Sequence, residues 1–212
     1  PYNQFSYLSN ISGAWIGRSF PLKKGKSPEE QSTRVVFSGG YTRTRYNEVQ
    51  SSSYDVINYF SPVDLYLFST GFSNRRYFTD RFILDFGEKE DVPTGWFTQI
   101  TAGYEKKGSL GRFYSGFTLG GAGYVGNSGY FSANAGIGGY YNEEKLSQGV
   151  ARVESFAFSR LFRLGNWRMR WFGYSGLTYG LNRLSNETIS LVKDEGIPGY
   201  KYQEPAGTSR FT

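Results

Sequence analysis

Three acidic residues stand close together in the segment GEKEDVPTG (87–95), and carboxylates at such spacing could do acid–base chemistry. A pair of carboxylates is the catalytic apparatus of glycoside hydrolysis, so an active site is one interpretation of this segment. A charged turn is the interpretation that we favour, because Pro93 and Gly95 are residues that set the backbone dihedrals of turns. The sequence therefore predicts a turn that contains Glu90, Asp91, Pro93 and Gly95.

Charged residues also recur at alternate positions in two later segments. Arg152 and Glu154 are two residues apart, as are Arg168 and Arg170, so each pair points to one side of an extended strand. We expect these side chains to face inward on neighbouring strands. One interpretation is a network of ion pairs that stiffens the fold, and the other is a charged surface that contacts a substrate. The predicted network consists of Arg152, Glu154, Arg168, Arg170 and Arg210.

The residue types that are missing exclude most other chemistry. The 212 residues include no His and no Cys, which excludes a Ser-His-Asp triad, a thiol nucleophile, a disulfide and a zinc-thiolate site. GAGYVG (121–126) matches a dinucleotide-binding pattern, but it lies within a strand-like stretch and opens no helix. We therefore expect no enzymatic activity, no cofactor and no metal site.

The net charge of +6 allows a nucleic-acid partner, but the basic residues are scattered along the chain. The densest group, KKGKS (23–27), is followed at once by PEE. A charge cluster of this kind is usually a solvated loop. We expect no nucleic-acid partner.

Alternation with a period of two runs through almost the whole chain. In GWFTQITAGYEKK (95–107), Trp96 and Ile100 fall on one face, whereas Gln99 and Glu105 fall on the other. Such alternation predicts half-buried strands, and the 18 Tyr, 18 Phe and 28 Gly residues favour strands and tight turns. The expected strands are 5–20, 33–46, 63–74, 77–87, 95–107, 110–125, 130–141, 149–163 and 166–180, with a further strand that starts at 207–212.

These strands are longer than the ~5–6 residues that are usual in soluble proteins. Long alternating strands, with aromatic residues near their ends and alternately short and long connections, are typical of a transmembrane antiparallel β-barrel. A soluble β-sandwich or propeller stays open as an alternative, because a single strand looks the same in both. The predicted fold is all-β, with residues 1–212 forming one β-barrel domain.

Loop length predicts a polarity for such a barrel, because short turns are periplasmic and long loops extracellular. The predicted periplasmic turns are EDVPTG (90–95), GNSG (126–129) and LGNW (164–167). The predicted extracellular regions are 106–111, 142–148 and 181–206. The segment 47–62 is long where this alternation demands a short connection.

The segment GIPGYKYQEPAGTSRF (196–211) resembles the sixth extracellular loop of the outer-membrane protein-assembly and surface-antigen superfamily, which includes the BamA-like and TamA-like barrels. EDVPTGW looks like an acidic-Pro-Gly turn of that superfamily, and NWRMRWF looks like the strand that enters the loop. The matched loop positions are Gly196, Ile197, Gly199 and Tyr200. Pro198 departs from the pattern, because the family has an arginine there that reaches into the lumen.

The resemblance spans roughly 75–212 and implies a portion of a sixteen-stranded barrel that lacks the N-terminal periplasmic domains and the last strands. It implies a place in the bacterial outer membrane and a role in the insertion or translocation of other proteins. The implied partners are outer-membrane lipid and client outer-membrane proteins. Two alternatives stay open, namely a passive porin-like or structural barrel and a soluble carbohydrate-binding β-domain.

Overall fold

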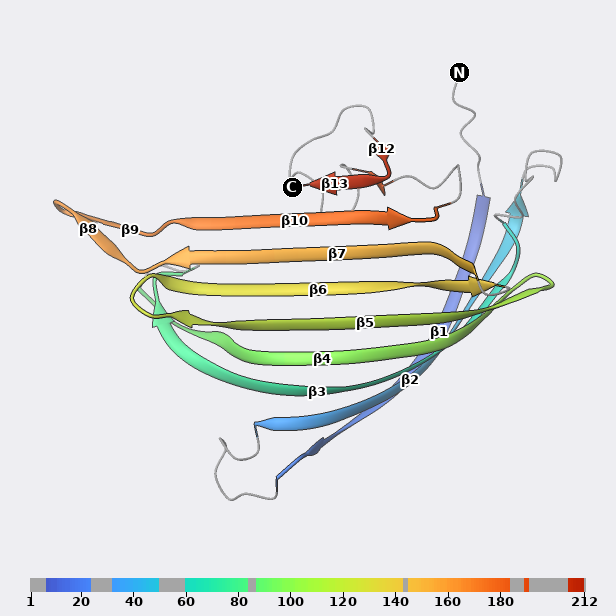
Figure 1. Ribbon diagram of the computed structural model, residues 1–212, viewed down its shortest axis with the longest axis horizontal. Coiled ribbons are helices and arrows are strands. Elements are labelled where there is room, and N and C mark those ends of the chain that lie inside the picture. The colour runs from blue at the N-terminus through green and yellow to red at the C-terminus, as the bar shows by residue number, and fades with distance from the viewer. Residues whose placement is uncertain are drawn as a thin grey trace.

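The computed structural model is built of β-strands (Figure 1). It describes residues 7–23, 32–49, 60–83, 87–142, 145–183, 189–190 and 206–211. Within these ranges, the chain has no helix that is long and apolar enough to cross a membrane. The expected all-β class is confirmed.

Nine strands form one antiparallel sheet, in which β1 to β7 each pair with their neighbours in sequence. In order across the sheet, the strands are β1 (Tyr7–Pro21), β2 (Thr33–Val49), β3 (Val63–Arg81), β4 (Lys89–Lys107), β5 (Leu110–Val125), β6 (Gly129–Asn142), β7 (Lys145–Ser159), β10 (Phe172–Leu181) and β13 (Ser209–Phe211). Two further two-stranded sheets pair β8 (Phe162–Leu164) with β9 (Trp167–Met169) and β11 (Ile189–Ser190) with β12 (Ala206–Gly207). The large sheet is open among the described residues, since β1 and β13 lie at its opposite edges.

Alternation in the sequence gives the sheet two chemically distinct faces. Directly opposite residues share a face, so the register of β2 to β7 and β10 shows on which face each side chain lies. The apolar face carries Phe68, Phe72, Trp96, Ile100, Phe117, Leu119, Ile137, Val153, Leu177 and Tyr179. The polar face carries Ser69, Ser73, Gln99, Thr101, Glu105, Thr118, Ser132, Asn134, Arg152 and Glu154.

One expected turn is absent, which changes the strand count. The expected strands 63–74 and 77–87 are one strand, β3, and the connection to β4 falls at 82–88. With this turn removed, the end of β2 and the start of β3 lie at the same end of the sheet as the end of β10. The position of 47–62 thereby no longer conflicts with the alternation. The contrast in length is weaker than expected, however, because β4–β5 and β6–β7 at that end are joined by 108–109 and 143–144 alone.

The predicted turn at 90–95 is wrong. Glu90, Asp91, Pro93 and Gly95 lie in β4 and pair with β3, from Arg75 opposite Gly95 up to Arg81 opposite Lys89. Proline is tolerated there because β5 pairs with β4 only from Gly95 onward, so Pro93 sits in a two-stranded extension with a free edge. Pairing with β3 keeps Glu90, Asp91 and Pro93 in the strand despite their turn-like sequence, and the strand bends only at Gly95.

The other two predicted turns are confirmed, at 126–128 and at 165–166. The strands around the second one are shorter than expected. Segments 149–163 and 166–180 are each interrupted, so that β8 and β9 form a separate hairpin beyond β7 and β10. A hydrogen bond from the Ser159 N–H to the Trp171 carbonyl, 2.9 Å long, closes the base of this hairpin.

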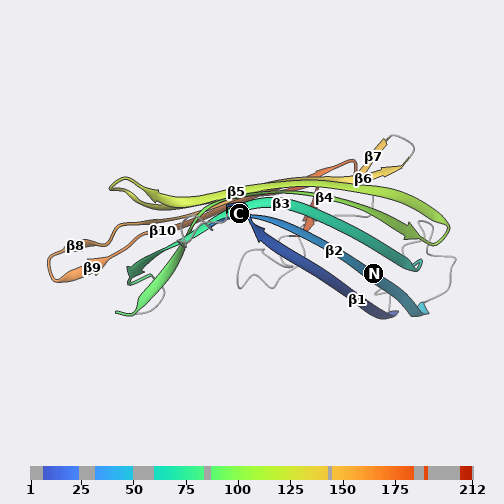
Figure 2. The ribbon, with the colours of Figure 1, turned by 90° about the horizontal axis from the view of Figure 1, so that it is seen from below.

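The sheet is bent rather than flat (Figure 2). The tip of the β3–β4 hairpin and strands β1 and β2 lie on the same side of β5 and β6 in this view. β4 turns at Gly95, whose φ is +118°, and this places Val92 against Tyr130 and Phe158 of the polar face. The polar face is therefore the side toward which the sheet bends.

Candidate functional site

The apolar face is the exposed face of the sheet. Many of its large side chains are exposed, and Ile100 is 57 % exposed while Phe68 is 54 % exposed. The buried hydrophobic core of the described residues is confined to Val92, Tyr130 and Phe158. A soluble antiparallel sheet commonly packs its apolar face on a core, whereas here the described residues leave the apolar face exposed.

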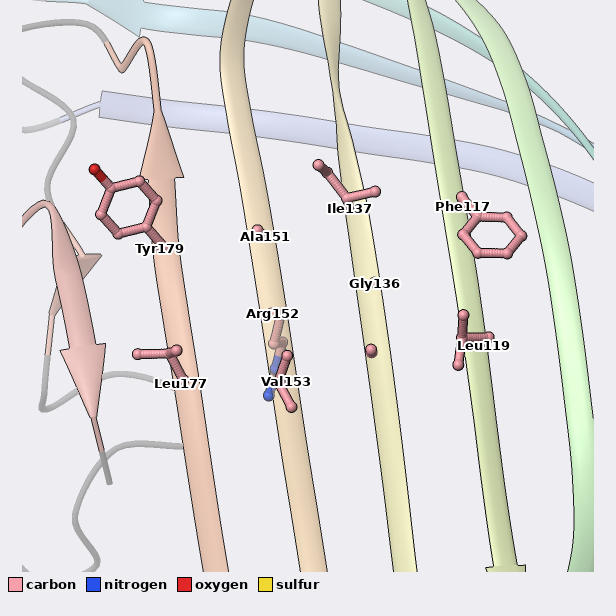
Figure 3. A pocket seen from close by; sticks show the side chains of 10 residues that line it. Phe117, Leu119, Gly136, Ile137, Ala151, Arg152, Val153, Leu177 and Tyr179 are labelled. Carbon is pink, nitrogen blue, oxygen red and sulfur yellow. The ribbon is translucent and has the colours of Figure 1, made fainter.

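A shallow depression of about 260 Å³ lies on the apolar face across β5, β6, β7 and β10 (Figure 3). Its lining combines the small residues Ala135 and Ala151 with the larger Phe117, Leu177 and Tyr179. Its lining is almost entirely hydrocarbon. The depression offers no group for catalysis, but it fits an apolar neighbour.

The polar face is lined by hydroxyl groups, amides and glycines. A cross-strand hydrogen bond of 2.9 Å joins Ser69 to Thr101. Glycine at position 120 makes room for the ring of Phe97. Two depressions of about 350 Å³ and 290 Å³ lie on this face, and their lining includes Ser69, Ser73, Gln99, Ser132 and Asn134. β1 departs from this pattern, because Trp15 lies on the polar face and is 82 % exposed.

Two of the five residues of the predicted charged network are brought together in the middle of this face. The guanidinium of Arg152 lies 2.6 Å from the Glu154 carboxylate, and the Tyr174 hydroxyl donates to the same carboxylate oxygen at 2.7 Å. The two charges sit on β7, and the tyrosine comes from β10. The hydrogen bond from Tyr174 to Glu154 therefore connects the adjacent strands β7 and β10.

Arg168 and Arg170 do not belong to that group. Arg170 donates to the Asp80 carboxylate at 3.2 Å, and Arg168 lies over the Phe82 ring, 5.5 Å from its centroid. The backbone of Arg210 pairs with Thr178, and its side chain lies outside the described residues. The predicted network is therefore divided between the centre of the polar face and one of its ends.

The contacts of Arg170 gather at the end of the sheet where the β3–β4 hairpin tip, 76–94, extends beyond the part shared with β5. Asp80 accepts hydrogen bonds from the Tyr124 hydroxyl at 2.9 Å and from the Arg81 backbone at 2.7 Å. Burial alone would raise the pKa of Asp80, but the hydrogen bonds and the charge of Arg170 outweigh it and hold the pKa below its ordinary value. The carboxylate is therefore charged at neutral pH and holds the hairpin tip on the polar face.

Sequence reasoning missed the one buried carboxylate among the described residues. Glu105 is 5 % exposed, and its carboxylate lies 2.7 Å from the Arg112 guanidinium. Arg112 also donates to Gln148 and covers the Tyr140 ring at 3.9 Å from its centroid. The sequence could have indicated this pair, because a tight turn at 108–109 places Glu105 directly opposite Arg112.

The loop motif predicted from the resemblance, namely Gly196, Ile197, Pro198, Gly199 and Tyr200, lies outside the described residues. Compared with known proteins, the chain matches no protein family, no curated protein and no solved structure. The resemblance to the assembly superfamily therefore stays a prediction.

Proposed function

We propose that this chain forms part of the wall of a transmembrane β-barrel in the bacterial outer membrane. The single observation that carries the proposal is the exposure of large apolar side chains along one face, while the ion pairs Glu105–Arg112 and Arg152–Glu154 lie on the other. In a barrel of this kind the apolar band faces lipid and the polar residues line the lumen. The spanning part is the sheet between its two ends, and the hairpin tip 76–94 lies outside it.

Strand length supports the same proposal. A spanning strand needs ~9–11 residues when it is tilted. Each of β1 to β7 has between 14 and 19 residues. The strands can therefore cross the hydrocarbon layer and continue into the interfacial regions on both sides.

Within this class, we propose the assembly-factor role, in which the barrel assists the insertion or translocation of other proteins at the outer membrane. The proposal rests on the sequence resemblance. An extended client strand would add to an open edge of the sheet through main-chain hydrogen bonds. No covalent step and no cofactor takes part.

The membrane proposal is tested by placing an arginine on each face in turn. Ile100 and Gln99 are adjacent in the part of β4 that pairs with both neighbours, but they point to opposite faces. An arginine on the lipid side near the bilayer midplane costs ~2–4 kcal/mol, whereas lumenal substitutions are tolerated. We expect Ile100→Arg to reduce folding into phospholipid vesicles strongly and Gln99→Arg to reduce it little, as measured by urea titration.

Equal effects of the two substitutions would count against a lipid-facing apolar face. A conductance measurement on reconstituted protein then separates the two membrane roles. A large steady pore would favour a passive porin-like barrel over an assembly factor. A small and intermittent conductance is expected for the proposed role.

A further inference from the structure

The β8–β9 hairpin carries an unusual concentration of positive charge. Its segment RLFRLGNWRMRW (160–171) contains four arginines and no acidic residue. The hairpin projects beyond the ends of β7 and β10 (Figure 1). It therefore presents its charge at the rim of the sheet rather than within it.

One side of this hairpin is apolar and exposed. Phe162 stands opposite Met169 and Leu164 stands opposite Trp167, across a two-residue turn. Trp167 is 76 % exposed and Leu164 is 65 % exposed. No protein contact within the described part of the chain explains why such large apolar groups occur at this position.

Trp171 links the apolar side of the hairpin to the apolar face of the sheet. It is an exposed residue at the base of the hairpin, and its ring lies over Gly173 of β10. Gly173 shares the face of Leu177, because the two are four residues apart on one strand. The surface proposed to face lipid therefore continues into the hairpin.

The other side of the hairpin pairs two like charges. Arg163 lies directly opposite Arg168. Like charges at directly opposite positions destabilise an antiparallel pair. In the ranges that the structure describes, neither guanidinium forms an ion pair with a carboxylate. An anion that contacts both groups would remove this repulsion.

We propose that the β8–β9 hairpin seats in the headgroup region of the bilayer and binds the phosphates of anionic phospholipids through Arg163 and Arg168. Tryptophan is enriched at membrane interfaces, and basic residues beside a membrane are attracted to anionic lipid. The apolar side, with Leu164 and Trp167, favours a lipid over a free phosphate ion. This inference rests on the proposed function, because it needs the sheet to span the same bilayer.

The test follows the hairpin with a fluorescent label. The chain has no Cys, so Asn166→Cys places a single dye at the hairpin turn. The labelled full chain is reconstituted in phosphatidylcholine vesicles that contain phosphatidylglycerol. Quenching by spin-labelled phosphatidylglycerol is then compared with quenching by spin-labelled phosphatidylcholine.

We expect phosphatidylglycerol to quench the dye more strongly than phosphatidylcholine. The double substitution Arg163→Gln and Arg168→Gln should reduce this preference by up to roughly thirtyfold, from the attraction of two basic residues to an anionic surface. The matched control is Arg76→Gln with Arg81→Gln, which removes two exposed arginines from the neighbouring β3–β4 hairpin. The control should keep the preference.

If the double variant fails to fold, salt provides the second measurement on the original chain, because added salt should weaken the preference by screening. Equal quenching by both lipids in a chain that has inserted would overturn the inference and leave the proposed function intact. If soluble polyglutamate or inorganic phosphate changes the dye fluorescence and the anionic lipid does not, the inference would also be overturned. Failure of the chain to insert, seen as full digestion of the sheet by added protease, would reject the proposed function itself.

Discussion

Glu105 shows how much a single residue contributes to this sheet. It is sheltered on the polar face, and its only close cationic partner among the described residues is Arg112. The Arg152–Glu154 pair offers a comparison, because its carboxylate is more exposed, at 26 %. The two pairs are chemically alike but differ in their access to water.

We expect Glu105→Gln to destabilise the protein by up to ~3 kcal/mol, because it leaves a guanidinium that is only 18 % exposed without its counter-charge. Glu154→Gln should cost ~1 kcal/mol or less, since water can solvate Arg152. Both values are to be measured as free energies of unfolding in urea, in the same vesicles. Similar losses in the two variants would mean that burial does not distinguish the pairs.

At the scale of the strand, β4 is the element whose geometry matters most. It is regular from Gly95 to Lys107, where it has two partners, and it extends beyond Gly95 with β3 alone. The φ of Gly95 is +118°, a conformation that other residues rarely adopt, and an added Cβ would collide with the Asn74 carbonyl. The bend that carries the hairpin tip onto the polar face therefore depends on this glycine.

Gly95→Ala should lower the free energy of unfolding by roughly 1–3 kcal/mol, through backbone strain. The same substitution should also detach the hairpin tip, which is measurable as faster hydrogen exchange at Val92. Gly123→Ala is the control, because its backbone is ordinary and a Cβ there would meet nothing within 4 Å. A loss at Gly123 equal to that at Gly95 would indicate a general intolerance of β-substituents.

The strands themselves were predictable from the sequence because their alternation survives in the structure, as Ile100 and Gln99 illustrate. The ends of the strands were not predictable, since Pro93 and Gly95 are typical turn residues but pairing with β3 keeps them in β4. Arg152 and Glu154 were predicted to lie together because they are two residues apart on one strand. The Asp80–Arg170 contact joins residues 90 positions apart, so no local pattern could have indicated it.

At the scale of the whole molecule, the residues that the structure describes place no second layer on the apolar face of the sheet, which a soluble β-protein needs. Side chains of the apolar face from Phe68 to Leu177 have no partner layer among the described residues. Contiguous apolar surface of this extent marks an interaction or a membrane-facing surface. The protein should therefore need an amphiphile to stay dispersed.

We expect the purified chain to be monodisperse in detergent micelles and to self-associate when the detergent is removed, because water cannot solvate the apolar face. Sedimentation velocity before and after detergent removal measures this directly. A monodisperse species in plain buffer would favour a soluble carbohydrate-binding domain instead. The exposed tyrosines and tryptophans would then be its candidate sugar contacts.

The neighbour-to-neighbour order of β1 to β7 also has a consequence for how the protein folds. Most pairings in this region close a short segment of chain, as at 108–109 and 126–128, so little loop entropy is lost at these steps. The sheet can grow by adding one hairpin at a time, without waiting for distant segments to meet. Folding should then proceed in stages along the chain, with each completed hairpin serving as the template for the next.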